Sequence, residues 1–124
     1  MTTYPILYTG INKALRFLGL GPQRSGVDVT EDSVRVRLGW AFHLEAPRSQ
    51  VASAALDTRP VLGWGAHGWG HVWLVNGSSK QLVRIDFTDL VHARTMVFAI
   101  RVRTLRVSVE DPDGLVRALG GVPA

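Results

Sequence analysis

Apolar and polar residues alternate along much of the first half of the chain, as they do in half-buried β-strands. Valine and leucine occupy every second position over residues 33–38, and the alternation continues after Gly39 over residues 40–45. Residues 27–29 follow the same pattern, and Glu31-Asp32 is typical of a turn between two strands. A period of two places apolar side chains on one face of a sheet and polar ones on the other. The pattern therefore predicts an antiparallel sheet with one face in water.

The alternation is interrupted after residue 46 and changes phase near the end of the chain. Pro47-Arg48 interrupts it, and residues 51–56 form a strand of mostly small residues. Residues 80–87 return to a strand pattern, and residues 88–110 hold one or two further strands. In this last region the apolar residues move from even to odd positions near Arg103-Thr104, which indicates a β-bulge or a turn there.

Residues 63–73 form the most unusual stretch, because glycine, tryptophan and histidine make up most of it. We expect a glycine loop in its first half and, in its second half, a strand that ends at Val75. Asn76-Gly77-Ser78 then predicts a hairpin to the strand over residues 80–87. A three-residue turn would gather the largest apolar group on one face of that hairpin. The group comprises Trp69, Trp73, Val83, Ile85 and Phe87.

Both ends of the chain predict helices. Residues 9–19 have a capping threonine, one apolar face and a terminal glycine, and with the linker that follows they make up residues 1–26. Asp111-Pro112 is typical of a capped helix start, and three apolar residues within 115–119 would face the core. Residues 27–122 then form a mainly β (α+β) domain, a bent antiparallel sheet or open barrel of about seven strands closed by the C-terminal helix.

Three stretches of the sequence resemble bacterial pleckstrin-homology-like (PH-like) domains. They are Val34-Arg35-Val36-Arg37-Leu38-Gly39, Ala46-Pro47-Arg48-Ser49-Gln50-Val51, and the run from Thr104 to Leu119 that contains Asp111-Pro112-Asp113-Gly114-Leu115. The resemblance implies a PH-like scaffold and a non-enzymatic module that binds proteins, peptides or lipid headgroups, or assembles with itself. Members that bind phosphoinositides have paired basic residues in the second strand, where this chain has Ala41, His43 and Glu45.

Composition excludes several classes of chemistry. The 124 residues include no cysteine, so disulfides, thiolate metal sites and cysteine nucleophiles are impossible. The sequence has neither a serine-nucleophile motif nor a glycine-rich phosphate loop, which argues against an enzyme without excluding one. We therefore expect no cofactor. Without a long apolar run or a signal peptide we also expect no transmembrane segment and a cytoplasmic location.

A cluster of basic residues lies near the end of the chain, whose net charge is +4. No acidic residue occurs among residues 90–109, which contain His92, Arg94, Arg101, Arg103 and Arg106. The alternating apolar residues from Met96 to Val102 favour a strand, with the arginines on its solvated face. If residues 96–100 were a loop, an apolar tip surrounded by arginines would suit an anionic membrane surface or nucleic acid.

The glycine-rich stretch supplies three further candidate residues. Trp64 lies between glycines and has no predicted strand partner, so it is a candidate ligand contact. His67 and His71 are four residues apart, a spacing that would face one metal ion on a helix. The intervening glycines argue against a helix, so we assign no metal and treat both as polar residues of the loop.

The sequence thus leaves three hypotheses for function. The first is a non-enzymatic module that binds a protein partner or itself, through a sheet edge to which a strand can be added. The second is electrostatic binding to nucleic acid or anionic lipid through the arginine-rich strand. The third is a small-ligand or metal-dependent enzyme that uses the tryptophan, histidine and glycine loop. The candidate binding residues are Trp64, His67, His71, Arg94, Arg101 and Arg103.

Overall fold

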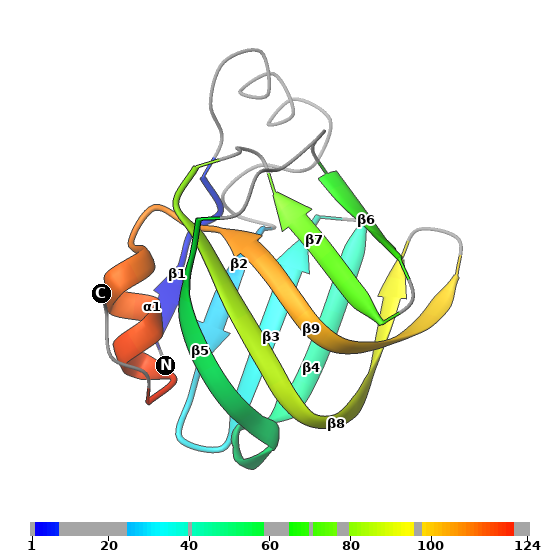
Figure 1. The fold of residues 1–124 in the computed structure, drawn as a ribbon, viewed down its shortest axis with the longest axis horizontal. Helices are drawn as coiled ribbons and strands as arrows, with labels where there is room; N and C mark the ends of the chain where they lie inside the picture. Colours follow the sequence, from blue (N-terminus) through cyan, green and yellow to red (C-terminus); the bar gives the residue numbers. More distant parts are fainter. Residues whose placement is uncertain are drawn as a thin grey trace.

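The strands of the computed structural model curl into one sheet that wraps around an apolar core (Figure 1). The structure describes residues 2–7, 25–39, 41–58, 65–69, 71–76, 80–95 and 98–120, with only the backbone given for residues 65–69 and 76. These described residues form nine strands and one α-helix: β1 Thr2–Tyr4, β2 Ser25–Val29, β3 Ser33–Leu38, β4 Phe42–Pro47, β5 Val51–Asp57, β6 Gly65–Trp69, β7 Val72–Asn76, β8 Leu82–Thr95, β9 Ala99–Ser108 and α1 Pro112–Ala118. The sheet order is β1-β2-β3-β4-β8-β9-β7-β6, and β5 pairs with β8 outside this path.

These elements confirm the mainly β class with a C-terminal helix and correct the number of strands. We expected about seven strands, and the two additional ones are β1 and β6. β1 lies within residues 1–26, and β6 lies where a glycine loop was expected. The helix predicted over residues 9–19 falls outside the described residues. Among the residues that are described, no helix is long and apolar enough to cross a membrane.

The first three predicted strands form the antiparallel meander that their alternation indicates. β2 pairs with β3, and β3 pairs with β4, with Val36 opposite both Val27 and Leu44. The inward side chains of β3 are fully buried, whereas the outward ones are partly exposed. Thr30 builds the turn between β2 and β3, because its Oγ1 accepts hydrogen bonds from the backbone N–H groups of Asp32 and Ser33.

A corner after β4 makes the sheet curl. Pro47 ends β4, a single 3-10 turn spans Arg48–Gln50, and β5 then runs on in a new direction. β4 pairs with the last residues of β8, whereas β5 pairs with its first residues, so that β8 follows both sides of the corner. The long strand β8 therefore joins the two halves of the sheet.

The register between β8 and β9 shifts where the sequence predicts a bulge or a turn. Asp86 lies opposite Thr104, but the next paired residues are Val91 and Val102. Arg103 consequently lies opposite the bulge, where the inward positions of β9 change from even to odd numbers. The backbone of β9 is stabilised at this register shift by the carbonyl oxygen of His71. This oxygen accepts hydrogen bonds from the backbone N–H groups of Arg103 at 2.8 Å and Thr104 at 3.2 Å.

The connection from β8 to β9 contradicts part of the strand that we expected over residues 96–102. The backbone N–H of Thr95 donates to the carbonyl of Phe98 at 2.8 Å, which brings the two strand ends together. Phe98 precedes β9 and is 66% exposed, so its predicted inward position is wrong. Val102 is buried as expected. Met96 and Val97, where the predicted alternation begins, lie outside the described residues.

The predicted hairpin between the tryptophan-rich strand and residues 80–87 is also wrong. β7 pairs in parallel with β9, Trp73 lying opposite Leu105, and it pairs antiparallel with β6. One edge of β8 is occupied by β9 and the other by β5 and β4, so β8 offers β7 no edge. Trp73 is partly buried against the core and stacks at an angle on Phe42, with ring centroids 6.3 Å apart.

The C-terminal helix begins and ends as the sequence predicts. The side chain of Asp111 accepts a hydrogen bond from the backbone N–H of Gly114 at 3.0 Å, and Pro112 is the first helical residue. Leu115 and Val116 are fully buried, which stabilises the fold by about 1.5–3 kcal/mol for each side chain. Gly120, with φ of +84°, ends the helix in a left-handed conformation that favours glycine.

The N-terminal segment joins two distant parts of the sheet. β1 pairs with β2, and immediately after it Ile6 forms a bridge with Val109 beyond the end of β9. The side chain of Ile6 is buried in the core. In Figure 1 this segment lies beside α1, on the side of the molecule opposite the β8–β9 connection.

Candidate functional site

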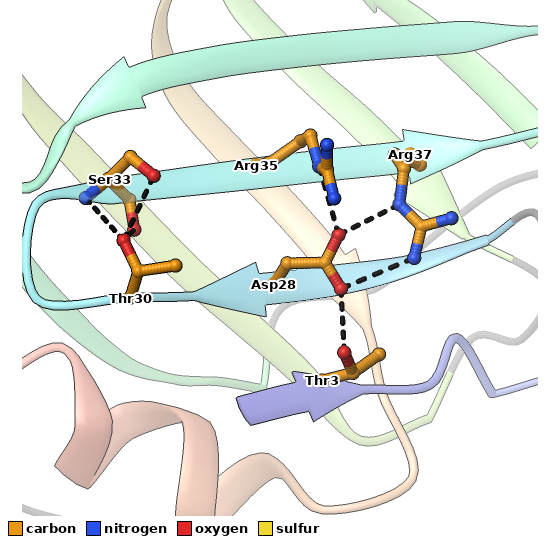
Figure 2. Close-up of polar contacts among 6 residues, drawn as sticks. All are labelled: Thr3, Asp28, Thr30, Ser33, Arg35 and Arg37. Carbon is orange, nitrogen blue, oxygen red and sulfur yellow. Dashed lines mark hydrogen bonds and ion pairs between the residues drawn. The ribbon is translucent and has the colours of Figure 1, made fainter. Parts of the chain in front are cut away.

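The outer face of the sheet holds a buried carboxylate, that of Asp28 on β2 (Figure 2). Asp28 is 1% exposed and accepts hydrogen bonds from three side chains. Arg35 Nε donates at 3.0 Å, Arg37 donates through Nε at 2.9 Å and Nη2 at 3.2 Å, and Thr3 Oγ1 donates at 2.8 Å. Two arginines and a hydroxyl thus saturate one negative charge.

The strand register explains this arrangement. Asp28 lies opposite Thr3 on β1 and opposite Arg35 on β3, and Arg37 is two residues further along the same face. Burial alone would raise the pKa of Asp28, but the hydrogen bonds from Arg37, Thr3 and Arg35 outweigh it and hold the pKa below its ordinary value. The carboxylate of Asp28 accepts all of these hydrogen bonds from side chains of β1 and β3, so its role is to hold these two strands and β2 together.

Two further acidic residues are paired in the same way. Asp86 on β8 accepts hydrogen bonds from Thr104 at 2.7 Å, from Arg84 and from Ser53. Burial raises the pKa of Asp86, and these hydrogen bonds more than offset that effect, so the pKa is lowered. Asp57 at the end of β5 binds Arg106 Nε at 2.5 Å, with both side chains largely buried. The arginines of β3, of the first half of β8 and of the last half of β9 therefore belong to the scaffold.

The arginines near the β8–β9 connection have a different environment. We define the basic face as the exposed side chains of His92, Arg94, Arg101 and Arg103. His92 lies directly opposite Arg101 in the ladder, and alternate residues of one strand point to the same side. These four basic side chains therefore gather on the outer surface of β8 and β9, near the ends of these strands that lie at the right of Figure 1.

The arginine side chains of the basic face carry charges that the fold does not neutralise. All ten acidic residues of the chain belong to the described segments, and none of them forms an ion pair with Arg94, Arg101 or Arg103. Glu45 on β4 is an acidic residue close to this surface, because it lines the same hollow as Arg94. The basic face is consequently a surface of net positive charge near the connection from β8 to β9.

Two shallow hollows flank His92 on this surface. The larger, of about 440 Å³, is lined among the described residues by His71, His92, Ala99, Ile100 and Arg101. The other, of about 360 Å³, is lined by His43, Glu45, His92, Ala93, Arg94 and Ala99. The ring of His71 is held over the edge of the larger hollow, because its Nδ1 lies 3.2 Å from the carbonyl oxygen of Arg101.

The structure brings four of the six predicted binding residues to one region: His71, Arg94, Arg101 and Arg103. The backbone of His67 lies in β6 opposite Leu74, and its side chain and the whole of Trp64 are outside the described residues. Within the described segments, histidine, aspartate and glutamate form no group of three that could hold a metal ion.

Sequence reasoning missed Asp28 and the hollow beside His92. Asp28 could have been found, because it is the one polar residue between two inward valines and the following turn places it opposite Arg35. The hollow could not, because His71 reaches it through the parallel pairing of β7 with β9. No protein-family model, curated protein or solved structure matches the chain.

Proposed function

We propose that this chain is a non-enzymatic binding module whose basic face binds single-stranded nucleic acid. The proposal rests on one observation: His92, Arg94, Arg101 and Arg103 share a surface on which no acidic side chain of the chain pairs with the arginines. Charges that do not stabilise the fold are available to phosphate groups. Each phosphate that an arginine neutralises releases counterions, which favours binding at low salt.

The form of the surface favours a single strand over a double helix. Arg101 and Arg103 are two residues apart on an extended strand, so their Cα atoms are separated by about 6.6 Å, a spacing that allows them to contact successive parts of one backbone. Phe98 stands 66% exposed at the end of the same hairpin. An exposed aromatic ring together with positively charged side chains suits unpaired bases, because every base can stack on such a ring.

The test is fluorescence anisotropy with a labelled oligouridylate at about 50 and 200 mM NaCl. We expect affinity to fall with salt, and the double variant R101A/R103A to bind at least about ten-fold more weakly, with a salt slope reduced by about one to two. Arg117→Ala is the matched control, because Arg117 is exposed on α1, at a distance from the basic face.

Two results would contradict this function. One is binding that is absent or insensitive to salt. The other is binding to vesicles of anionic lipid without binding to the oligonucleotide, which would assign the basic face to a membrane surface. Equal losses in R101A/R103A and Arg117→Ala would show a general effect of net charge and would also count against a specific face.

A second candidate function is self-association through β6. This strand ends the sheet and pairs only with β7 among the described strands, so one of its edges can accept another strand. Light scattering over a range of concentrations tests it, and a strict monomer at high concentration would exclude it. A PH-like scaffold also stays a proposal, supported by the bent sheet that runs into a closing helix at Asp111-Pro112.

A further inference from the structure

We infer that the hollow between His71, His92 and Arg101 is a subsite for one phosphate group. The inference deepens the proposed function and rests on it for the identity of the larger partner that carries the phosphate. The hollow has a volume of about 440 Å³ and opens on the basic face. It unites side chains from β8, from β9 and from the turn before β7, and His71 in that turn is 30 positions from Arg101.

The ladder between β8 and β9 places two of the three groups side by side. His92 and Arg101 are directly opposed, and their side chains project outward from neighbouring strands about 4.8 Å apart. The next outward residue of β9 toward the tip is Ala99, whose methyl group leaves the space beside them open. A guanidinium with its fork of N–H donors and an imidazole therefore both line this open hollow.

The third group, His71, is held in place from two directions. Its carbonyl oxygen accepts from the backbone of Arg103 and Thr104 at the bulge, which fixes the turn. Its Nδ1 lies 3.2 Å from the carbonyl of Arg101, and since a carbonyl only accepts, Nδ1 carries the proton of that hydrogen bond. Nε2 is then the ring nitrogen that takes no part in this contact.

The charges around the hollow select an anion. Arg101 lines the hollow, and Arg94 and Arg103 are neighbouring outward residues of the same two strands. Their positive charges would repel a metal cation, although two imidazoles are present. The neighbouring hollow contains Glu45 and His43 beside Arg94, and its carboxylate disfavours an anion there. A phosphate monoester or diester fits the larger hollow, because arginine binds two of its oxygens at once and the imidazoles reach a third.

Inorganic phosphate is a direct probe of this subsite. We would follow the side-chain NMR signals of arginine and histidine while titrating phosphate against chloride at equal ionic strength. We expect saturable shifts at His71, His92 and Arg101 with phosphate, and none that saturate with chloride. His92→Gln should weaken phosphate binding about ten-fold, as expected when a hydrogen bond to a charged group is lost.

His43→Gln is the matched control, because it removes an exposed histidine from the same outer surface but from the neighbouring hollow. Phosphate affinity should be unchanged in that variant. Equal losses in the two variants, or phosphate shifts spread evenly over Arg94 and Arg103, would overturn the subsite. Each variant is a substitution of an exposed side chain, so both are expected to fold, which a thermal unfolding curve verifies.

The oligonucleotide experiment separates this inference from the proposed function. If His92→Gln weakens both phosphate and oligouridylate, the subsite holds a phosphate of the nucleic acid. If phosphate binds at His92 and the oligonucleotide does not bind at all, the subsite stands and the proposed function fails. If the oligonucleotide binds in a salt-dependent manner while His92→Gln leaves both affinities unchanged, the subsite is wrong and the proposed function stands.

Discussion

The outer surface of the sheet carries arginines in two regions. The arginines of one region form ion pairs, and those of the other do not. At β2 and β3, Arg35 and Arg37 close on the buried carboxylate of Asp28 and tie three strands together. At the far ends of β8 and β9, Arg94 and Arg101 stand exposed without an acidic partner. The same residue type on the same face therefore has two roles, and the position of the ten acidic residues decides between them. Paired arginines should affect stability, and the exposed ones should affect binding.

The largest effect is expected from Asp28→Asn in the paired region. Asparagine retains one acceptor oxygen but loses the charge that Arg35 and Arg37 share, so two positive groups are left facing each other. We expect the free energy of unfolding to fall by about 2–4 kcal/mol, somewhat below a fully buried pair because both arginines reach solvent. Urea unfolding measures the loss. Asp32→Asn, in the exposed turn nearby, is the control and should change little.

Acid should remove part of the same stabilisation. The pKa values of Asp28 and Asp86 are lowered in the folded chain, so these groups contribute stability that is complete above the ordinary aspartate pKa. That contribution is lost as the pH falls through the lowered, folded-state pKa values, because both carboxylates then become protonated. Unfolding free energies measured from neutral pH downward should decline in this range. Asp28→Asn should show a shallower decline, and an unchanged decline would contradict the role given to Asp28.

A smaller effect compares the arginines of the two regions directly. Arg35→Gln should lower the free energy of unfolding by about 1 kcal/mol, because it removes a charged hydrogen bond that is partly exposed. R101A/R103A should leave it within about 0.5 kcal/mol, as is usual for exposed positions. Oligonucleotide affinity should show the opposite order. If both variants lowered stability equally, the distinction between paired and exposed arginines would be lost.

The smallest effect on stability is expected at Phe98. Since this ring is 66% exposed, Phe98→Ser should change the free energy of unfolding by less than about 0.5 kcal/mol. Binding of oligouridylate should weaken about five-fold or more, because one stacked base contributes about 1–3 kcal/mol. Anisotropy and thermal unfolding of the same samples provide both numbers. An unchanged affinity would remove Phe98 from the binding surface and leave the arginines alone to carry it.

Local patterns were enough to predict the meander, the corner, the bulge and the helix. Val34, Val36 and Leu38 have a period that only a half-buried strand satisfies, and Asp111 caps a helix through its own neighbours. The bulge near Arg103 followed from a change of parity along one strand. The pairing of β7 could not be obtained in this way. The shortest route from Val75 leads to residues 80–87, but both edges of β8 are taken by strands that are distant in sequence.

The candidate site was predictable in its charges and not in its shape. The absence of acidic residues from positions 90–109 singled out Arg94, Arg101 and Arg103, and these side chains are exposed and without acidic partners. The sequence also placed Phe98 in the core, because alternation does not mark where a long hairpin turns. His71 was a candidate for a different reason, and only the three-dimensional arrangement places it beside Arg101.

The bridge between Ile6 and Val109 has a consequence for the order in which the chain folds. Ser108 also donates to the carbonyl of Leu7, a contact between residues 101 positions apart. Residues 2–7 are synthesised long before Ser108 and Val109. On a growing chain, the hydrogen bonds between these two segments can therefore form only after β9 has been made. Contacts of such high sequence separation slow folding, because a long loop must close before they form. We therefore expect the meander from β2 to β4 to form early in refolding and the N-terminal segment to dock last.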